Sequence, residues 1–529
     1  MDADRMDADQ TEAEIPHDAL GRRVSCGDHR ATVRFVGTVP PTAGVWLGVE
    51  WDDPRRGKHD GRHQGVRYFT CRHPTGGSFV RPSVASFGVD FAAALRCHYA
   101  THAGDEEISI SGRTLEWADV RERSLESLPT VLLANCQVNG PGEDGQILRT
   151  TPNVRWLDLS ASLLRSWDDV AAIARQLRHL EALLLSFNRL SLPSDPAAHR
   201  QAFPNLKVLT LIDCELTWTQ VLRCAPMWPK LEELIVENNN ITQLQRPEGV
   251  LQGLKCLNVS KNPLDQDSLL ELGALPRLEH LIVTDTGLSK VHFPDAAPGE
   301  ETSVFASLEK LNVRRNNISE WGVIDELSKL ASLRRLWCQE NPLASSDGNP
   351  KTAYQMLIAK LPHLLVLNGS DVPPQERKGA EYDYLKMFGE EWLRAAGQSQ
   401  LSQEFANRHP RYRSLVDKYG APDEGELTKR QPFALKNQLL KITFVFEDDV
   451  ARMPLEKKLP GSQCLRAASM EVQKVKGLLS RLLKVPAVDL RLSYTSAKHT
   501  GPEYPMDNDQ KTLFFYAVED GDTVVVRRS

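Results

Sequence analysis

The sequence predicts a multidomain protein with both α and β structure, in three folded parts that follow one another along the chain. Its 529 residues are too many for one hydrophobic core, since domains average about 150 residues. Short extended runs broken by Gly and Pro fill the first part, one template recurs through the middle, and strand and helix patterns alternate near the C-terminus. These patterns predict a small β-barrel, an α/β solenoid and a small domain of strands and one helix.

The composition is that of an ordinary soluble protein, with 25% charged and 41% hydrophobic residues. The formal net charge of -6 argues against a nucleic-acid-binding chain, for which a basic balance is typical. No apolar run reaches the length of about 18 residues that a spanning helix needs. The nine cysteines are scattered and never spaced as CxxC, which indicates reduced cytosolic thiols and no zinc site. We therefore expect neither a nucleic-acid nor a membrane partner.

Residues 1–17 are acidic and lack the basic and apolar regions of a signal peptide, so we expect a disordered tail. Residues 18–90 form the predicted barrel, with the extended runs "ATVRFVG", "VWLGVEW" and "GSFVRP". Between these runs lies "GKHDG", Gly57 to Gly61. Glycine allows a positive φ or a close approach of the backbone to a ligand, so this segment is a candidate binding turn.

The motifs "RATVRFVG", "WLGVEWD", "GKHDG", "YFTC" and "GGSFVRP" follow one another in residues 18–90. In this order they resemble the CAP-Gly domain, which recognises acidic C-terminal tails that end in an aromatic residue. The resemblance implies that the N-terminal barrel binds such a tail.

A tail of this kind needs hydrogen-bond donors, positive charge and an apolar slot. Lys58 supplies a cation, and the backbone N–H groups between Gly57 and Gly61 are donors. The predicted tail-binding site comprises Phe35, Trp46, Gly57, Lys58, His59, Asp60, Gly61 and Phe79. Its slot walls are Phe35, Trp46 and Phe79, although Trp46 and Phe79 could instead belong to the barrel core. A positive field is expected from Arg55, Arg56, Arg62, Arg67 and Arg72.

His59 stands where the CAP-Gly family usually has Asn. A neutral imidazole can still donate a hydrogen bond, and its protonation near about pH 6 to 7 would add charge beside the carboxylates of the tail. We expect tail binding to tighten as the pH falls from about 7.5 to about 6.

The middle of the chain, residues 121–395, repeats the template LxxLxLxxNxL and follows a connector at 91–120. Copies begin at Leu180, Leu206, Leu231, Leu254, Leu278, Leu308 and Leu333, with weaker ones at Leu128 and Val154. This pattern resembles the leucine-rich repeat, whose leucines point inward. The resemblance implies that one side-chain amide per repeat bonds buried backbone groups, here at Asn188, Asn239, Asn262, Asn316 and Asn341.

A repeat array needs a cap over its last apolar face. The segment "LPHLLVLNGSDVPPQERKGAEYDYLKMF", 361–388, resembles the C-terminal cap of cytosolic leucine-rich repeat proteins. The strand face of the array is then available to a partner protein, with Glu237, Asn258, Arg314 and Trp337 as candidate contacts.

Residues 396–437 are polar and predict a linker with some helix. From 438 to 529 the chain shows a strand in "LKITFVFED", a helix in "EVQKVKGLLSRLLKV", and strands in "LRLSYTSAK" and "DGDTVVV". This order resembles the ubiquitin-like β-grasp fold. No Gly-Gly follows Val526, so we expect a docking module that is not conjugated through its C-terminus.

Catalytic motifs are missing from the sequence, which contains no GxxxxGK[ST], GxSxG or HExxH segment. Cys71 and His73 alternate along the chain and would point to opposite faces of a strand. We expect no enzyme activity, no catalytic residue, no cofactor and no metal site.

A CAP-Gly domain, leucine-rich repeats and a ubiquitin-like domain in this order resemble the tubulin-folding cofactor E family. The resemblance implies a cytoplasmic, cytoskeleton-associated protein that captures α-tubulin. It also implies assembly and dissociation of the α/β-tubulin heterodimer with tubulin-folding cofactors B, C and D and β-tubulin. Two alternatives remain open: a microtubule plus-end adaptor, although no sustained heptad for a coiled coil is present, and an adaptor whose ubiquitin-like domain binds proteasome or ubiquitin receptors.

Overall fold

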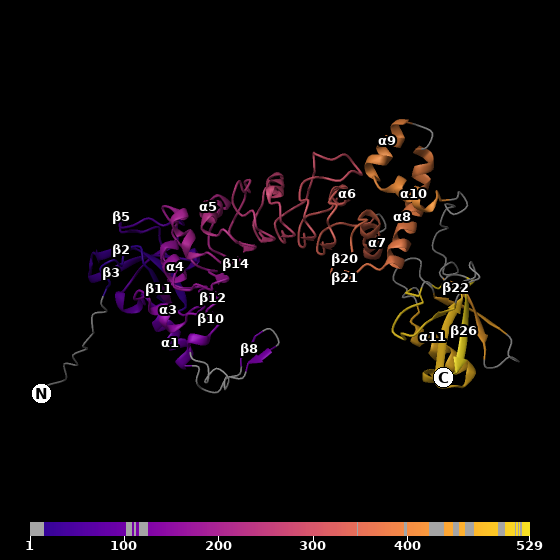
Figure 1. Ribbon diagram of the computed structural model, residues 1–529, viewed down its shortest axis with the longest axis horizontal. Coiled ribbons are helices and arrows are strands. Elements are labelled where there is room, and N and C mark those ends of the chain that lie inside the picture. Colours follow the sequence, from indigo (N-terminus) through magenta and orange to yellow (C-terminus); the bar gives the residue numbers. More distant parts are fainter. Residues whose placement is uncertain are drawn as a thin grey trace. The chain divides into compact units, whose positions relative to one another are not determined.

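The computed structural model describes residues 15–101, 108–110, 113–115, 125–345, 348–395, 399–422, 439–447, 454–460, 470–495, 503–513, 515–516, 518 and 521–528. The chain divides into two compact units, Met1–Ala421 and Pro422–Ser529 (Figure 1). Almost all of the predicted acidic tail lies outside the described residues, as do residues 102–107, 111–112 and 116–120 of the connector and residues 423–437 of the linker. In the described ranges, no helix is long and apolar enough to cross a membrane.

The N-terminal barrel is built on a four-stranded antiparallel sheet in the order β1-β2-β3-β6. These strands are β1 (Arg23–Cys26), β2 (His29–Val39), β3 (Thr42–Trp51) and β6 (Gly77–Val80), and β4 (Arg62–His63) and β5 (Val66–Arg67) form a separate hairpin. Two 3-10 helices, η1 (Pro54–Arg56) and η2 (Pro82–Val84), complete it. Its core contains Val24, Ala31, Val33, Leu47, Val49 and Trp51.

The segment after the barrel is part of the repeat array, which differs from the predicted connector. Strand β7 (Val89–Asp90) pairs in parallel with β11 (Val138–Gly140). Helix α1 (Phe91–Thr101) buries Phe91 and Leu95 in the core of the array. A short hairpin, β8 (Ile108–Ile110) and β9 (Arg113–Leu115), follows. The apolar residues of "FAAALRC" are buried in the array core, so this part of the predicted connector covers the open end of the first repeat.

The array is one eleven-stranded sheet whose strands follow the order of the chain. All neighbours are parallel except β20 and β21. The strands are β10 (Thr130–Leu132), β12 (Trp156–Asp158), β13 (Ala182–Leu184), β14 (Val208–Thr210), β15 (Glu233–Ile235), β16 (Cys256–Asn258), β17 (His280–Ile282), β18 (Lys310–Asn312), β19 (Arg335–Trp337), β20 (Val366–Leu367) and β21 (Ser370–Asp371).

Short helices complete the turns of the array and are separated from its strands by the leucine core (Figure 1). They are η3 (Leu125–Ser127), α3 (Gln146–Thr150), α4 (Trp167–Ala174), η4 (Pro196–Ala202), α5 (Trp218–Cys224), η5 (Ala225–Met227), η6 (Asp267–Ala274) and α6 (Trp321–Leu327). Helices α4 and α5 begin at capping boxes, in which Ser166 and Thr217 accept from the third helical N–H.

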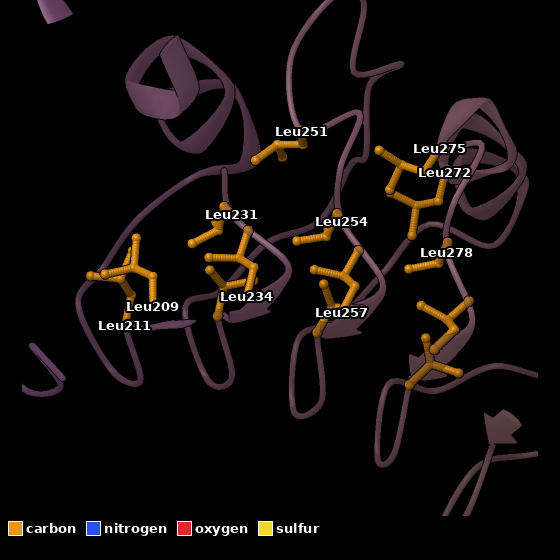
Figure 2. Close-up of a cluster of buried hydrophobic side chains, with 14 of the residues drawn as sticks. Leu209, Leu211, Leu231, Leu234, Leu251, Leu254, Leu257, Leu272, Leu275 and Leu278 are labelled. Atoms are coloured by element: carbon orange, nitrogen blue, oxygen red, sulfur yellow. The ribbon is translucent and has the colours of Figure 1, made fainter. Parts of the chain in front are cut away.

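The template leucines fill the interior, as the sequence predicts. Figure 2 shows leucines of successive coils, such as Leu209, Leu234 and Leu257, pointing into one shared core. The predicted amide ladder is also present. Asn262 accepts from the backbone N–H groups of Asn239 and Ile241 and donates to buried carbonyl oxygens. The ladder explains how the turn beside each strand satisfies its buried backbone groups.

The C-terminal end of the array is covered by four helices: α7 (Pro350–Lys360), α8 (Pro374–Ala395), α9 (Ser399–Arg408) and α10 (Tyr412–Tyr419). The last two lie in the segment predicted as a linker, yet Phe405, Tyr412 and Leu415 are buried in the core of the array. In α10 the apolar residues Tyr412, Leu415, Val416 and Tyr419 stand at helical spacing, which indicates a helix with one buried face. The folded array therefore continues beyond the predicted boundary at residue 395.

The second unit has a five-stranded sheet in the order β23-β22-β26-β24-β25 with one long helix. Its elements are β22 (Leu439–Phe446), β23 (Leu455–Pro460), α11 (Val472–Leu483), η9 (Ala487–Asp489), β24 (Leu490–Thr495), β25 (Tyr504–Pro505) and β26 (Thr523–Arg528). The first and last strands are parallel neighbours, and α11 buries Val472, Val475 and Leu479 against the sheet. This topology confirms the predicted β-grasp fold.

Candidate functional site

The GKHDG turn lies against the start of β6. The backbone N–H groups of Lys58 and His59 donate to the carbonyl oxygen of Gly77 at 2.7 and 3.2 Å, and the Gly77 N–H donates to His59 at 2.7 Å. A Cβ at Gly57 would stand 1.9 Å from the Thr75 carbonyl oxygen. Gly61 has φ +96°, which L side chains rarely adopt. Close approach and backbone conformation thus explain the two glycines that bracket the turn.

Several rings gather beside this turn, and His63 lies at their edge with its ring centroid 6.1 Å from Phe79. We define the aromatic cluster as the other five: Phe35, His59, Tyr68, Phe69 and Phe79. Phe79 is central, with its ring centroid 6.2 Å from Phe35, 5.0 Å from His59, 5.4 Å from Tyr68 and 5.5 Å from Phe69. Most of these contacts are edge-to-face, as is favoured for aromatic pairs. All but Phe69 are half-buried, so the cluster presents ring surface to a ligand while it supports the turn.

Trp46 is placed differently from the other predicted wall residues. Its ring stacks on Arg81, whose guanidinium carbon is 3.8 Å from the ring centroid, and its N–H donates to Thr42 at 3.1 Å. Trp46 lies two residues along β3 from Gly48, which pairs with both Phe35 and Phe79. The structure therefore groups Phe35, His59 and Phe79, with Trp46 on the same strand face but held by its own cation contact.

The sequence prediction did not include Tyr68 and Phe69, although it used "YFTC" as a motif. Residues 68 and 69 lie outside any strand, in a segment whose N–H groups point to the Gly61 carbonyl oxygen. Two adjacent aromatic residues shortly after the glycine turn were the feature of the sequence that could have indicated their part in the site.

The positive charges around the turn are not equivalent. Arg55 is bound to Asp53 at 2.9 Å, and Arg67 is bound to Asp60 at 3.1 Å. Lys58 is exposed, and no carboxylate of the described residues lies within 4.0 Å of its ammonium group. Arg56 is also exposed and has no carboxylate partner among the described residues, but its guanidinium carbon lies 4.6 Å from the centroid of the Trp51 ring. Asp60 thus organises the turn, and Lys58 is the cation within the turn that is available to an acidic ligand.

His59 is less easily protonated than the sequence suggested. Burial lowers the pKa of His59 below its ordinary value of 6.5, and the charge of neighbouring His63 acts in the same direction. Its Nδ1 accepts a hydrogen bond from the Gly61 N–H at 3.1 Å, which requires that nitrogen to be unprotonated. Any tightening through protonation of His59 should therefore occur at a lower pH than the sequence suggests, because burial disfavours the charged ring.

An NMR titration of histidine-labelled protein should accordingly place the His59 midpoint below pH 6.5. Affinity for an acidic tail peptide should stay constant from about pH 8 to about pH 7, because the neutral ring dominates over this range. A tightening in this range that disappears in His59→Asn would contradict this assignment.

A second candidate surface lies on the strand face of the array, where the residues beside each buried central leucine point outward. Six apolar side chains on strands β10 to β17 form what we call the apolar strip: Leu132, Trp156, Leu184, Val208, Ile235 and Ile282. Leu132 is 38% and Trp156 50% exposed, and the other four are half-buried. A parallel sheet is normally covered on both faces, so a partly exposed apolar face indicates a protein partner.

The four contacts predicted for this face are divided by the structure. Asn258 and Trp337 lie on β16 and β19, where Trp337 has its ring centroid 6.4 Å from His280. Glu237 and Arg314 lie in the turns after the strands and form ion pairs with Lys261 at 2.8 Å and Glu340 at 2.9 Å. The strand face of the array is therefore more apolar than the four predicted contacts, three of them polar or charged, had suggested.

Clustered ligands for a metal ion are not found in the described ranges, where no group of three or more His, Cys, Asp and Glu side chains comes together. Burial raises the pKa of the Cys71 thiol to about 11, with Glu50 adding to the effect. Such a thiol stays protonated at neutral pH and is a poor nucleophile.

Comparison with known proteins agrees with the N-terminal motifs. Residues 20–85 match the CAP-Gly domain family. Tubulin-specific chaperone E from Danio rerio is 52% identical over 524 residues, covering 97% of this chain and 99% of that protein. The Homo sapiens protein of the same name is 48% identical over 527 residues, covering 96% and 98%. The solution structure of the C-terminal ubiquitin-like domain of mouse tubulin-specific chaperone e is 50% identical, covers 17% of this chain and 88% of that domain, and gives a TM-score of 0.16.

Proposed function

The chain belongs to the tubulin-specific chaperone E family, and we propose that it captures α-tubulin through two contacts. The acidic, aromatic-ended tail of α-tubulin binds at Lys58 and the aromatic cluster, and its folded body binds on the apolar strip. The observation that carries the proposal is the exposed Lys58 ammonium, without a carboxylate partner in the described residues, beside half-buried rings and a glycine-bracketed turn. A cation and an apolar slot are two of the three groups that an acidic tail with a terminal ring requires. The backbone N–H groups of Lys58, His59 and Gly61, expected from the sequence as the third, are instead bonded within the barrel.

Two contacts are needed because the buried area of the tail contact is small compared with that of the tubulin subunit interface. A short tail in a shallow site buries little area, whereas an obligate subunit interface buries about 2,000 Å² or more. A protein that assembles or separates the tubulin heterodimer must compete with an interface of this class. The strand face of the array is a large preformed surface, which makes it the proposed contact for the body of α-tubulin.

The proposed activity is assembly and dissociation of the α/β-tubulin heterodimer in the cytoplasm, with tubulin-folding cofactors B, C and D and β-tubulin as partners. A chaperone acts by binding its client protein, so we propose a binding function without catalysis for this chain. The β-grasp domain is a docking module, and proteasome or ubiquitin receptors are its alternative partners. Recovery of soluble tubulin together with the other cofactors from cell extract would favour the chaperone activity over either adaptor role.

Lys58→Ala should weaken binding of a peptide that ends in Glu-Glu-Tyr by about 2 kcal/mol, because it removes a charge-assisted hydrogen bond. Fluorescence anisotropy with the full chain measures this change. Arg55→Ala is the matched control, since the Arg55 guanidinium is already bound to Asp53. Equal affinity for a peptide without the terminal tyrosine would contradict the proposed mode of recognition.

A further inference from the structure

The barrel is joined to the array by several contacts besides the continuous chain, among them Arg30 to Asn135 at 2.7 Å and Arg165 to Asp18 at 3.3 Å. Two further attachments bear on the position of the tail-binding turn.

The first is the segment at the end of the barrel. The Val89 N–H donates to the Gln137 carbonyl oxygen at 3.1 Å, and the Asn139 side chain donates to the Phe87 carbonyl oxygen at 2.9 Å. Gly88 is required there, because a Cβ would stand 2.1 Å from the Gln137 carbonyl oxygen. This attachment holds the end of the barrel and, among the described residues, does not contact the loop beside the tail-binding turn.

The second attachment is an ion-pair network that we call the clasp, formed by Arg72, Arg189, Asp213 and Glu215. Arg72 of the barrel bonds Glu215 of the array directly. Arg189 bonds Glu215 at 3.1 Å and Asp213 at 3.1 Å from a largely buried position, with 13% of its side chain exposed. The clasp lies far from β7 in the sequence and fixes a different part of the barrel.

Both sides of the clasp are held by the features already described. On the barrel side, Arg72 begins the loop that ends at Gly77, which anchors the GKHDG turn, and its N–H donates to the Glu50 carboxylate at 2.6 Å. On the array side, the amide ladder holds the turn, because Asn239 accepts from the N–H groups on either side of Glu215 at 2.9 and 3.1 Å. The clasp therefore links the tail-binding turn to the repeat framework.

We propose that Arg72 and Glu215 are positioning residues that hold the tail-binding site in register with the apolar strip, so that one α-tubulin molecule engages both. This inference rests on the proposed function. Two linked contacts gain affinity only when their geometry allows simultaneous engagement, and a fixed orientation increases the effective concentration of the second contact. The clasp residues thus control the coupling between the contacts without forming either one.

The solvent exposure of Arg72 and Glu215 indicates how loss of their ion pair should affect folding stability and tubulin affinity. The side chains of Arg72 and Glu215 are 57% and 30% exposed, and surface ion pairs contribute little to folding stability. Glu215→Arg should therefore leave the chain folded, while like charges on Arg72, Arg189 and residue 215 push the loop away from the array. Its affinity for the tubulin heterodimer should fall about tenfold through loss of effective concentration.

The test compares the full chain, Glu215→Arg, and the charge swap Arg72→Glu with Glu215→Arg. For each, the affinity for tubulin is divided by the affinity for the tail peptide, which corrects for any direct effect of residue 72 on the tail. Hydrogen exchange of residues 72–77 reports the clasp itself. Arg315→Glu, which breaks the exposed pair with Glu340, is the control for surface charge.

Glu215→Arg should lower the ratio and speed exchange of residues 72–77. The charge swap should restore both in part, because it rebuilds the pair between residues 72 and 215 while Arg189 still faces the new arginine. Tubulin without its α-tail should bind Glu215→Arg and the unaltered chain equally. An unchanged ratio, or a ratio that the swap fails to raise, would overturn the positioning role. Unchanged exchange in Glu215→Arg would refute the clasp. Failure of the unaltered chain to bind the tail peptide would instead refute the proposed function.

Discussion

Asn316→Ala should lower the free energy of unfolding of the array by about 3 kcal/mol, since it leaves several buried polar groups without partners. The Asn316 side chain is 4% exposed. It accepts from the Thr286 and Leu288 N–H groups at 3.0 Å each and donates to the Val283 and Val313 carbonyl oxygens at 2.7 and 3.0 Å. The alanine side chain has no polar atom, so these buried backbone N–H and carbonyl groups would lose their side-chain partner.

Asn317→Ala is the matched control for this prediction. Asn317 is exposed and makes one long hydrogen bond, 3.5 Å to the Gly287 carbonyl oxygen, so its loss should change stability by no more than about 0.5 kcal/mol. Urea unfolding with hydrogen exchange of the array amides separates the array from the two other folded parts. Equal stabilities for the two variants would show that the amide ladder does not stabilise the array.

Ile235→Asp should weaken binding of the tubulin heterodimer about 100-fold, because it places a charge in the centre of an apolar contact. Ile235 is half-buried on β15, in the middle of the apolar strip, and its aspartate would remain solvated in the free chain. Affinity for the tail peptide should not change. Leu365→Asp, at a 59% exposed leucine outside the strip, is the control. Equal tubulin affinity for both variants would remove the strip from the mechanism.

The features that the sequence predicted are those encoded by short periodic patterns. Each template leucine and each ladder asparagine repeats the same local environment, so one copy predicts the next. The glycine turn and Lys58 were found in the same way, from a motif of five residues. In each case the residues that determine the structure lie close together in the chain.

The features that the sequence did not predict depend on contacts between distant segments. Arg72 and Glu215 are 143 positions apart, and no local pattern relates them. Tyr68 joins the aromatic cluster because a loop folds over β6. The burial of Phe405 and Tyr412 depends on how α9 and α10 pack on α8. The depressed pKa of His59 likewise follows from burial beside Phe69 and Phe79, which the sequence alone could not specify.

The most direct test of two-contact capture is the affinity of four chains for tubulin with and without the α-tail: the unaltered chain, Lys58→Ala, Ile235→Asp and the double variant. Surface plasmon resonance with immobilised chain measures all eight pairs. The account predicts that Lys58→Ala weakens binding of intact tubulin but leaves tail-less tubulin unaffected, whereas Ile235→Asp weakens binding of both. If Lys58→Ala weakened tail-less tubulin equally, or Ile235→Asp left it unaffected, the assignment of tail and body to these two surfaces would be contradicted.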